Sequence, residues 1–192
     1  FRRVLFRSSA FMEFDKNGKQ LTTEVTRGVI RSGFRLTYES VNQFFESGQP
    51  VSEWPEGLSD MLVDMREMAS ILRNGRLERG SLDFDFPDWR VKLDASNVPV
   101  DVYQYRRGDA EKLIEEFMIA CNESIAAHLF HLGLPCMFRV HESPARKDLD
   151  ELNEAIEPLG YRVKGTNNPH PRAIQSVLDD VKGKPEEVFV SD

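Results

Sequence analysis

Two adjacent glutamates, Glu115 and Glu116, stand in the middle of an otherwise apolar stretch, and their carboxylates are the groups best suited to chemistry. The stretch covers residues 109–132 and reads DAEKLIEEFMIACNESIAAHLFHL. Glu115 and Asn122 are seven residues apart, so they share one face of a helix, where polar groups can point at a ligand. The alternative is that Glu115 pairs with an arginine, or that both groups face solvent, because long acidic side chains are seldom buried without a partner.

Tyr38 is a second candidate, because a phenol can both donate and accept a hydrogen bond. Thr37 fits a helix N-cap with Ser40 three residues further on, which places Tyr38 in the first turn of a helix. The alternative is an amphipathic tyrosine on the surface.

Two groups of residues have spacings that could suit a metal ion. Asp83 and Asp85 would project from the same side of a strand, as metal-binding carboxylates can, but a solvated strand face is the commoner interpretation. His128 and His131 are three residues apart on a predicted helix, and Cys121 precedes them by about two turns. No second pair of ligands is present to complete the tetrahedral coordination of a zinc ion. We therefore predict no metal site in this chain.

The elements that position these residues are predicted from apolar spacing, caps and turns. The stretch 109–132 is apolar almost all the way round, which predicts a central buried helix. The expected order is a hairpin over 9–14 and 20–32, a helix after Thr37, a helix over 56–78 with its methionines in the core, strands over 89–94 and 98–106, the central helix, a strand over 137–141, a helix over 144–158, a strand over 161–163 and a helix over 172–181. This order predicts an α+β fold with a mixed or antiparallel sheet packed around the long central helix.

The composition fits one soluble domain. The 192 residues are 40% hydrophobic, which is enough to bury a core. No run approaches the roughly 20 apolar residues that a membrane span needs. The two cysteines, Cys121 and Cys136, give no disulfide framework and fit a reducing compartment, so a cytoplasmic location is expected.

Residues 1–8, FRRVLFRS, look like a translated sequencing adapter rather than native protein. We therefore expect an adapter-like segment over 1–8 and a partial domain over 9–192 that is truncated at both ends. Leaving out Arg2, Arg3 and Arg7 changes the formal net charge from −7 to −10. This acidic balance argues against nucleic-acid binding through a broad basic surface, but it does not exclude a narrow channel.

No P-loop, dinucleotide fingerprint, G-x-S-x-G elbow or H-E-x-x-H motif occurs in the sequence. Four segments do match a known family in order and spacing: 36–41 (LTYESV), 79–85 (RGSLDFD), 113–122 (LIEEFMIACN) and 138–142 (FRVHE). Together they resemble the catalytic RNB domain of the RNase II/RNase R (VacB) exoribonuclease family. The resemblance runs over residues 9–189, and bacterial RNase R is the nearest in style.

The resemblance implies a processive 3′→5′ exoribonuclease that hydrolyses RNA to nucleoside 5′-monophosphates with Mg²⁺. The family's metal-binding aspartates would precede Ser9, so no catalytic residue is expected in this chain, and the fragment alone is expected to be inactive. The implied RNA contacts are Tyr38 and Glu115, which distinguish ribose from deoxyribose, and Phe84, which stacks on terminal bases. The implied partner is the 3′ end of single-stranded RNA, with no DNA or membrane partner, and the full-length enzyme is expected to be a monomer.

Two other interpretations remain open at this point. One is a catalytically dead RNB-like protein that binds RNA or serves as a scaffold, which would lack the upstream aspartates. The other is an unrelated α+β domain in which Glu115 is structural, and in which Tyr38, Phe84 and Glu115 would not line a common cleft.

Overall fold

The computed structural model describes residues 4–50, 52–82, 88–140, 142–165 and 170–191. The chain forms two compact units, one made of Phe1–Gly75 with Arg106–Phe138 and the other of Arg76–Tyr105 with Arg139–Asp192. Among the described residues, no helix is both long enough and apolar enough to cross a membrane.

The first unit opens with an antiparallel hairpin of β1 (Val4–Phe14) and β2 (Gln20–Arg31). In the turn, the side chain of Asp15 accepts hydrogen bonds at 2.9 Å from the backbone N–H groups two and four residues further on. Gly18 supplies the positive φ that the turn needs. The predicted hairpin is confirmed, and β1 begins before residue 9, so that residues 4–8 pair with residues 27–31.

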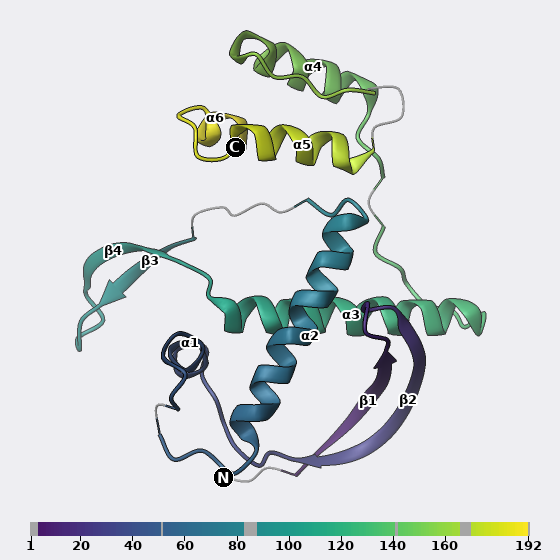
Figure 1. Cartoon of the computed structure of the whole chain (residues 1–192), viewed down its shortest axis with the longest axis vertical. Helices are drawn as coiled ribbons and strands as arrows, with labels where there is room; N and C mark the ends of the chain where they lie inside the picture. The colour runs from purple at the N-terminus through teal and green to yellow at the C-terminus, as the bar shows by residue number, and fades with distance from the viewer. Residues whose placement is uncertain (1–3, 51, 83–87, 141, 166–169, 192) are drawn as a thin grey trace. The chain divides into compact units, whose positions relative to one another are not determined.

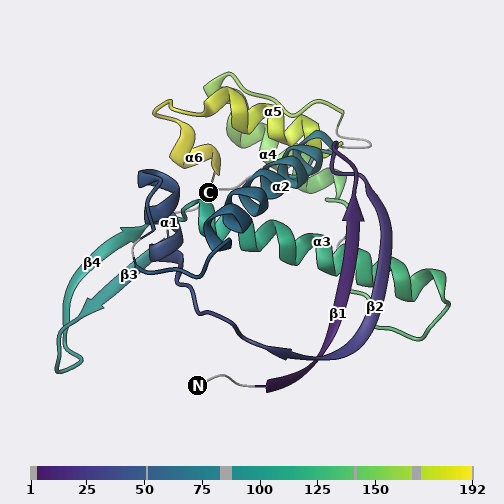
Figure 2. The ribbon, with the colours of Figure 1, turned by 60° about the horizontal axis from the view of Figure 1, so that its bottom comes forward.

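Two helices and the start of a third enclose the core of the first unit: α1 (Tyr38–Ser47), α2 (Leu58–Glu78) and α3 (Asp109–His131). The buried apolar residues of this core are Val41, Phe44, Leu62 and Ala110. Trp54 packs edge-on against Phe44, with 5.1 Å between the ring centroids. In Figures 1 and 2, α2 crosses α3, and the core residues bring α1 and α2 together with the beginning of α3.

The helix α2 agrees with the predicted helix over 56–78, but its methionines are not all in the core. Met61 is exposed, so the predicted burial is wrong for this residue. Its neighbour Leu62 takes the buried position instead, because a shift of one residue on a helix turns the side chain by about 100°. On the same helix, the side chain of Ile71 lies against Gly18 of the hairpin turn.

The helix α3 has the predicted bounds within one residue, but the prediction that it is buried on all sides is wrong. Its buried side chains form one stripe: Ala110, Leu113, Glu116 and Ser124. On other faces Met118 is 60% exposed and Phe130 is 71% exposed. The curved β1–β2 hairpin crosses the second half of α3 (Figure 2), where the Ser124 hydroxyl donates to the Gln20 side chain at 2.6 Å.

The prediction of a single sheet around this helix is also wrong. Among the described residues, the strands form two separate antiparallel pairs, β1–β2 and β3–β4. The α+β class itself is confirmed, since antiparallel strand pairs and groups of helices follow one another in separate blocks along the chain. Side-chain alternation predicted each hairpin correctly, but alternation does not report whether two hairpins join edge to edge.

The second unit contains the hairpin β3 (Asp88–Leu93) and β4 (Pro99–Tyr105), and helices α4 (Arg146–Ile156), α5 (Pro171–Val181) and α6 (Glu187–Ser191). A short 3₁₀ turn, η1 (Glu157–Leu159), follows α4. The helical core consists of Ile156, Val163 and Val177. The predicted hairpin and helices of this unit are confirmed within a few residues.

Two predicted short strands are not strands. Residues 137–140 of the predicted strand 137–141 have no strand partner, and Met137 is almost fully exposed. Residues 161–163 are also outside any strand: the Tyr161 N–H donates to the Ile156 carbonyl, and the side chain of Asn153 binds the backbone of Val163. Its amide accepts from the Val163 N–H at 2.7 Å and donates to the Val163 carbonyl at 3.2 Å. A side chain thus supplies the hydrogen bonds that a neighbouring strand would have given.

Candidate functional site

Tyr38 is the first residue of α1, and a complete cap fixes its backbone. The Thr37 hydroxyl accepts a hydrogen bond from the Ser40 N–H at 3.2 Å, and the Ser40 hydroxyl accepts one from the Thr37 N–H at 3.2 Å. This reciprocal pair is the capping box that holds a helix start in place. The predicted N-cap at Thr37 is confirmed, and it leaves the Tyr38 side chain 46% exposed and within reach of a ligand.

Glu115 lies near the middle of α3 and pairs with Arg107, just before the helix begins. The Arg107 Nη1 atom is 3.2 Å from the Glu115 Oε2 atom, and the two side chains are 39% and 37% exposed. The arginine pairing considered from the sequence is therefore present. Because the carboxylate accepts at several lone pairs, an ion pair on one oxygen leaves acceptor capacity for another donor.

Glu116 has the opposite environment, although it is the next residue. Its side chain is 2% exposed, and Arg73 of α2 approaches it with an Nη1 to Oε1 distance of 3.4 Å. The sequence did contain a signal for this difference, because Glu116 shares a helix face with the apolar residues Leu113 and Ala120, at helical spacings of three and four. The acidic pair thus divides into one glutamate that faces outward and one that stabilises the packing of α2 on α3.

The helices that carry Tyr38 and Glu115 pack directly on each other. The Asn42 side chain, one turn after Tyr38, accepts from the Ala110 N–H at 2.8 Å and donates to Glu111 at 2.8 Å. Glu111 is one turn before Glu115 on α3. The structure therefore places both residues on adjoining helices of the same unit.

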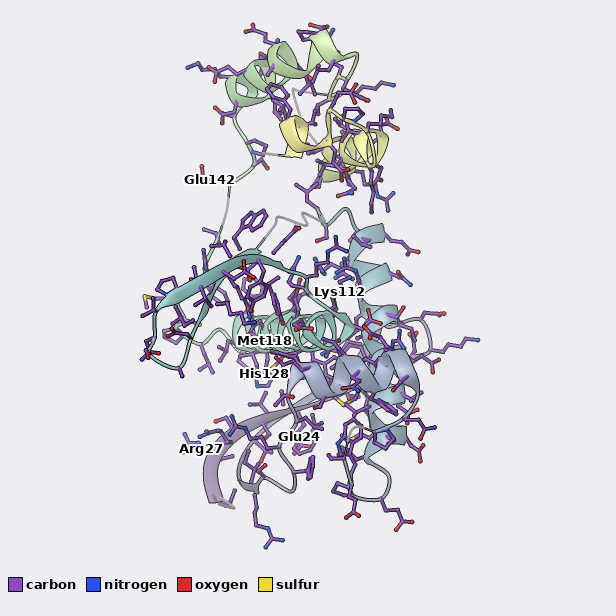
Figure 3. All side chains as sticks on the ribbon, turned by 90° about the vertical axis from the view of Figure 1, so that its left-hand side faces the viewer. Glu24, Arg27, Lys112, Met118, His128 and Glu142 are labelled. Carbon is purple, nitrogen blue, oxygen red and sulfur yellow. The ribbon has the colours of Figure 1, made fainter. Side chains whose placement is uncertain are left out.

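The remaining predicted site residues are placed as follows. Phe84, Asp83 and Asp85 lie outside the described residues. The histidine candidate His128 lies in the second half of α3. Figure 3 also labels Met118, which lies just before the middle of α3, and Glu24 and Arg27 of β2, none of which was a predicted site residue. Within the ranges that the structure describes, no three His, Cys, Asp or Glu side chains come together as a possible metal site.

Comparisons with known proteins identify the family of the chain. The RNB domain family profile matches residues 8–191. The chain is 37% identical over 179 residues to ribonuclease R of Aquifex aeolicus, and 40% identical over 178 residues to ribonuclease R of Thermotoga maritima. These alignments cover 93% and 92% of this chain, but only 25% of the length of each relative.

The fold is similar to that of solved ribonucleases. Mycoplasma genitalium RNase R in complex with ribose methylated single-stranded RNA matches with a TM-score of 0.91 at 23% identity, over 98% of this chain and 30% of that chain. The same enzyme in complex with double-stranded RNA matches with a TM-score of 0.92 at 23% identity, over 98% of this chain and 34% of that chain. The profile match extends over nearly the whole sequence and confirms the resemblance that the motifs indicated, so this chain belongs to the RNB domain family.

Proposed function

We propose that this chain is the ribose-recognising part of the catalytic domain of a processive, hydrolytic 3′→5′ exoribonuclease that releases nucleoside 5′-monophosphates from RNA. The observation that carries the proposal is the RNB match over residues 8–191, together with 37% and 40% identity to two proteins named ribonuclease R. The chain spans 25% of the length of those relatives, and the proposal assigns it the recognition of RNA rather than the complete reaction.

The chemistry of ribose recognition fits the two exposed polar residues. A ribose 2′-OH is both a donor and an acceptor, and deoxyribose has neither. Glu115 supplies a carboxylate acceptor, and Tyr38 supplies a hydroxyl that can donate or accept. Both side chains are more than a third exposed, and their helices are joined through Asn42, which supports their action on one sugar. A site that binds the 2′-OH would reject DNA, because its polar groups would lose their partner.

Phe84 is assigned to stacking on the bases near the 3′ end of single-stranded RNA. Its placement lies outside the described residues, so this role rests on the resemblance of the segment 79–85 alone. Stacking of one base on an aromatic ring contributes roughly 1–3 kcal/mol and is indifferent to sequence, as a processive enzyme requires. The structural neighbour's complex with single-stranded RNA supports the same class of partner.

The Mg²⁺ ions implied by the family do not fit the described residues of this chain. No three potential ligands among His, Cys, Asp and Glu come together there, so we derive no step through the metal. We propose that the ligands are supplied by parts of the full-length enzyme outside this chain. On this view the 192-residue chain alone releases no nucleotide from labelled RNA, with or without Mg²⁺. A cytoplasmic location and a monomeric full-length enzyme stay predictions.

A chimera tests the proposal. Residues 9–191 of this chain replace the matching segment of the Thermotoga maritima ribonuclease R, which is 40% identical to it. We expect the chimera to degrade RNA from the 3′ end and to leave DNA of the same sequence intact, and we expect Glu115→Ala and Tyr38→Phe to reduce this discrimination. Gln43→Ala changes an exposed amide of α1 and serves as the matched control.

The result that contradicts the proposal is a folded chimera that treats RNA and DNA alike, or one whose discrimination is unchanged by Glu115→Ala. The enzyme assignment has a separate test in the gene itself. Reading the DNA upstream of Ser9 should reveal a motif with several aspartates. If the native coding sequence there contains no such motif, the catalytically dead RNA-binding scaffold becomes the better assignment.

A further inference from the structure

We infer that Asn42 is a positioning residue for ribose recognition, because it completes the N-terminal cap of α3 from a different helix and thereby fixes Glu115 relative to Tyr38. This inference rests on the proposed function of that pair. The observations that carry it are the hydrogen bonds at the start of α3, the close approach of Asn42 to Gly108, and the spacing along the two helices.

The cap of α3 is incomplete within its own sequence. In a capping box, the N-cap side chain accepts from an N–H of the first turn, and a Glu three residues later accepts from the N-cap N–H. Glu111 performs the second part, since its Oε2 atom accepts from the Gly108 N–H at 3.0 Å. Gly108 occupies the N-cap position and has no side chain for the first part. The N–H groups of the first turn would otherwise lack an acceptor within the helix.

Asn42 supplies the missing acceptor from α1. Its Oδ1 atom accepts from the Ala110 N–H at 2.8 Å, which is one of the bonds that an N-cap side chain normally makes. Its Nδ2 atom donates at 2.8 Å to the same Glu111 oxygen that holds the Gly108 N–H. Lys112, which is labelled in Figure 3, is the residue after Glu111 on α3 and marks this end of the helix. The two helices are therefore joined by a hydrogen-bonded group of four residues rather than by apolar packing alone.

Only glycine at position 108 leaves room for this contact with Asn42. A Cβ atom added to Gly108 would lie closer than 3.0 Å to the side-chain carbon, nitrogen and oxygen atoms of the Asn42 amide. The backbone of Gly108 is extended, so conformational freedom is not the reason for a glycine here. The glycine instead makes room for the amide of Asn42, which shows that the two positions fit each other as a pair.

The position of this junction connects it to the proposed site. Tyr38 precedes Asn42 by one helical turn on α1, and Glu115 follows Glu111 by one helical turn on α3, so each pair shares a helix face. Arg107, which pairs with Glu115, directly precedes Gly108. A change in the angle between α1 and α3 at Asn42 would thus move both the carboxylate and its arginine relative to the phenol.

The test uses the chimera described above and compares its rates on RNA and DNA of one sequence. We expect Asn42→Ala to reduce the RNA-to-DNA rate ratio on the order of tenfold, since misplacement by about 1 Å can cost a hundredfold. Asn42→Asp should reduce it as well, because it places a second carboxylate against Glu111. The double variant Asn42→Asp with Glu111→Gln removes this repulsion and re-forms the bond between the two helices with donor and acceptor exchanged. It should restore most of the ratio but not all of it, because the amide nitrogen that now donates to the new carboxylate on α1 cannot accept from the Gly108 N–H.

Two controls separate positioning from a general loss of structure. Ser124→Ala removes a buried hydrogen bond between α3 and the hairpin, nine residues beyond Glu115, and should leave the ratio unchanged. Gln43→Ala should do the same. Amide exchange of Ala110 in the 192-residue chain should accelerate in Asn42→Ala and return to its slow rate in the double variant.

The outcomes distinguish this inference from the proposed function. A wild-type chimera that does not discriminate overturns both. If the wild type discriminates and Glu115→Ala lowers the ratio, an unchanged ratio in Asn42→Ala overturns the positioning role alone. An equal fall in Asn42→Ala and Ser124→Ala also overturns it, because the effect would then be structural.

Discussion

Arg73→Ala should destabilise the first unit of the chain far more than Arg107→Ala, although both changes remove an arginine from one of two neighbouring glutamates on α3. The Arg73 partner, Glu116, is 2% exposed, whereas Glu115, the partner of Arg107, is 37% exposed. The chain thus contains a buried and an exposed version of the same ion pair within one helical turn. The comparison isolates the effect of burial.

The magnitudes follow from the cost of leaving a charge without its partner. Breaking a buried ion pair costs about 3–5 kcal/mol, because the remaining charge has lost its water and its partner. Arg73 itself keeps 22% exposure, and its Nη1 atom is 3.4 Å from the Glu116 Oε1 atom, so the expected loss lies at or just below the lower limit of that range, at about 2–3 kcal/mol. An exposed pair such as Arg107 with Glu115 is screened by water, and its loss should cost less than about 1 kcal/mol.

Urea unfolding followed by tryptophan fluorescence provides the assay. The sequence contains two tryptophans, and Trp54 packs against Phe44 in the core of the first unit. Trp89 is exposed on β3 in the second unit, so Trp89→Phe gives a background in which Trp54 alone reports on the first unit. The free energy of unfolding is then compared between Arg73→Ala and Arg107→Ala.

The double variant Arg73→Met with Glu116→Leu supplies the internal control. Replacing both members of a buried pair by apolar side chains is often neutral or stabilising, so this variant should recover most of the lost stability. The reasoning is refuted if Arg73→Ala costs no more than Arg107→Ala. It is equally refuted if the apolar double variant is as unstable as Arg73→Ala, because the loss would then come from packing and not from the unpaired charge.

Three further predictions concern the second unit. Gly80→Ala should lower the free energy of unfolding by about 1–3 kcal/mol, and by more than Gly183→Ala does. Both glycines have a positive φ, but only at Gly80 would the added Cβ meet side-chain atoms, at 3.2–3.4 Å. Urea unfolding followed by circular dichroism compares the two variants. Asn153→Ala should cost about 2–3 kcal/mol in the same assay, since it leaves a buried N–H and a buried carbonyl without partners. The hydrogen bond from Lys184 to the Tyr161 hydroxyl raises the pKa of the ammonium group, and Tyr161→Phe should lower that pKa in an NMR titration. Because the folded pKa is raised, the stabilisation by Lys184 is complete below the pKa of an unfolded lysine and is lost as the pH rises through the raised value.

Local signals in the sequence predicted the elements well, because the groups that start and stop them are neighbours in the chain. The Thr37 cap with its Ser40 partner set the beginning of α1, and the Asp15 turn with Gly18 set the first hairpin. These features depend on hydrogen bonds that span two to four residues, which a pattern of residue types can reveal.

The failures concern partners that are distant in sequence. Apolar residues on every face of α3 indicate a preference for burial, but they do not say which other element supplies it, and Met118 remains exposed. The segment at Val163 alternates like a strand, yet its backbone binds the Asn153 side chain. The sequence also gave no indication that Asn42 would cap α3, since the two positions are 68 residues apart.

The two glutamates of α3 show why a motif alone cannot assign roles. Residue types make Glu115 and Glu116 equivalent, and only their angular positions differ, by about 100° around the helix. This rotation of about 100° places Glu116 in the contact with α2, where Arg73 stabilises its charge, while Glu115 faces outward beside Arg107. Ligand recognition needs an accessible carboxylate, and packing needs a neutralised one, so each position suits a single role. A Glu116→Gln variant with reduced stability and a Glu115→Gln variant that keeps its stability but loses discrimination are the expected consequences of this division.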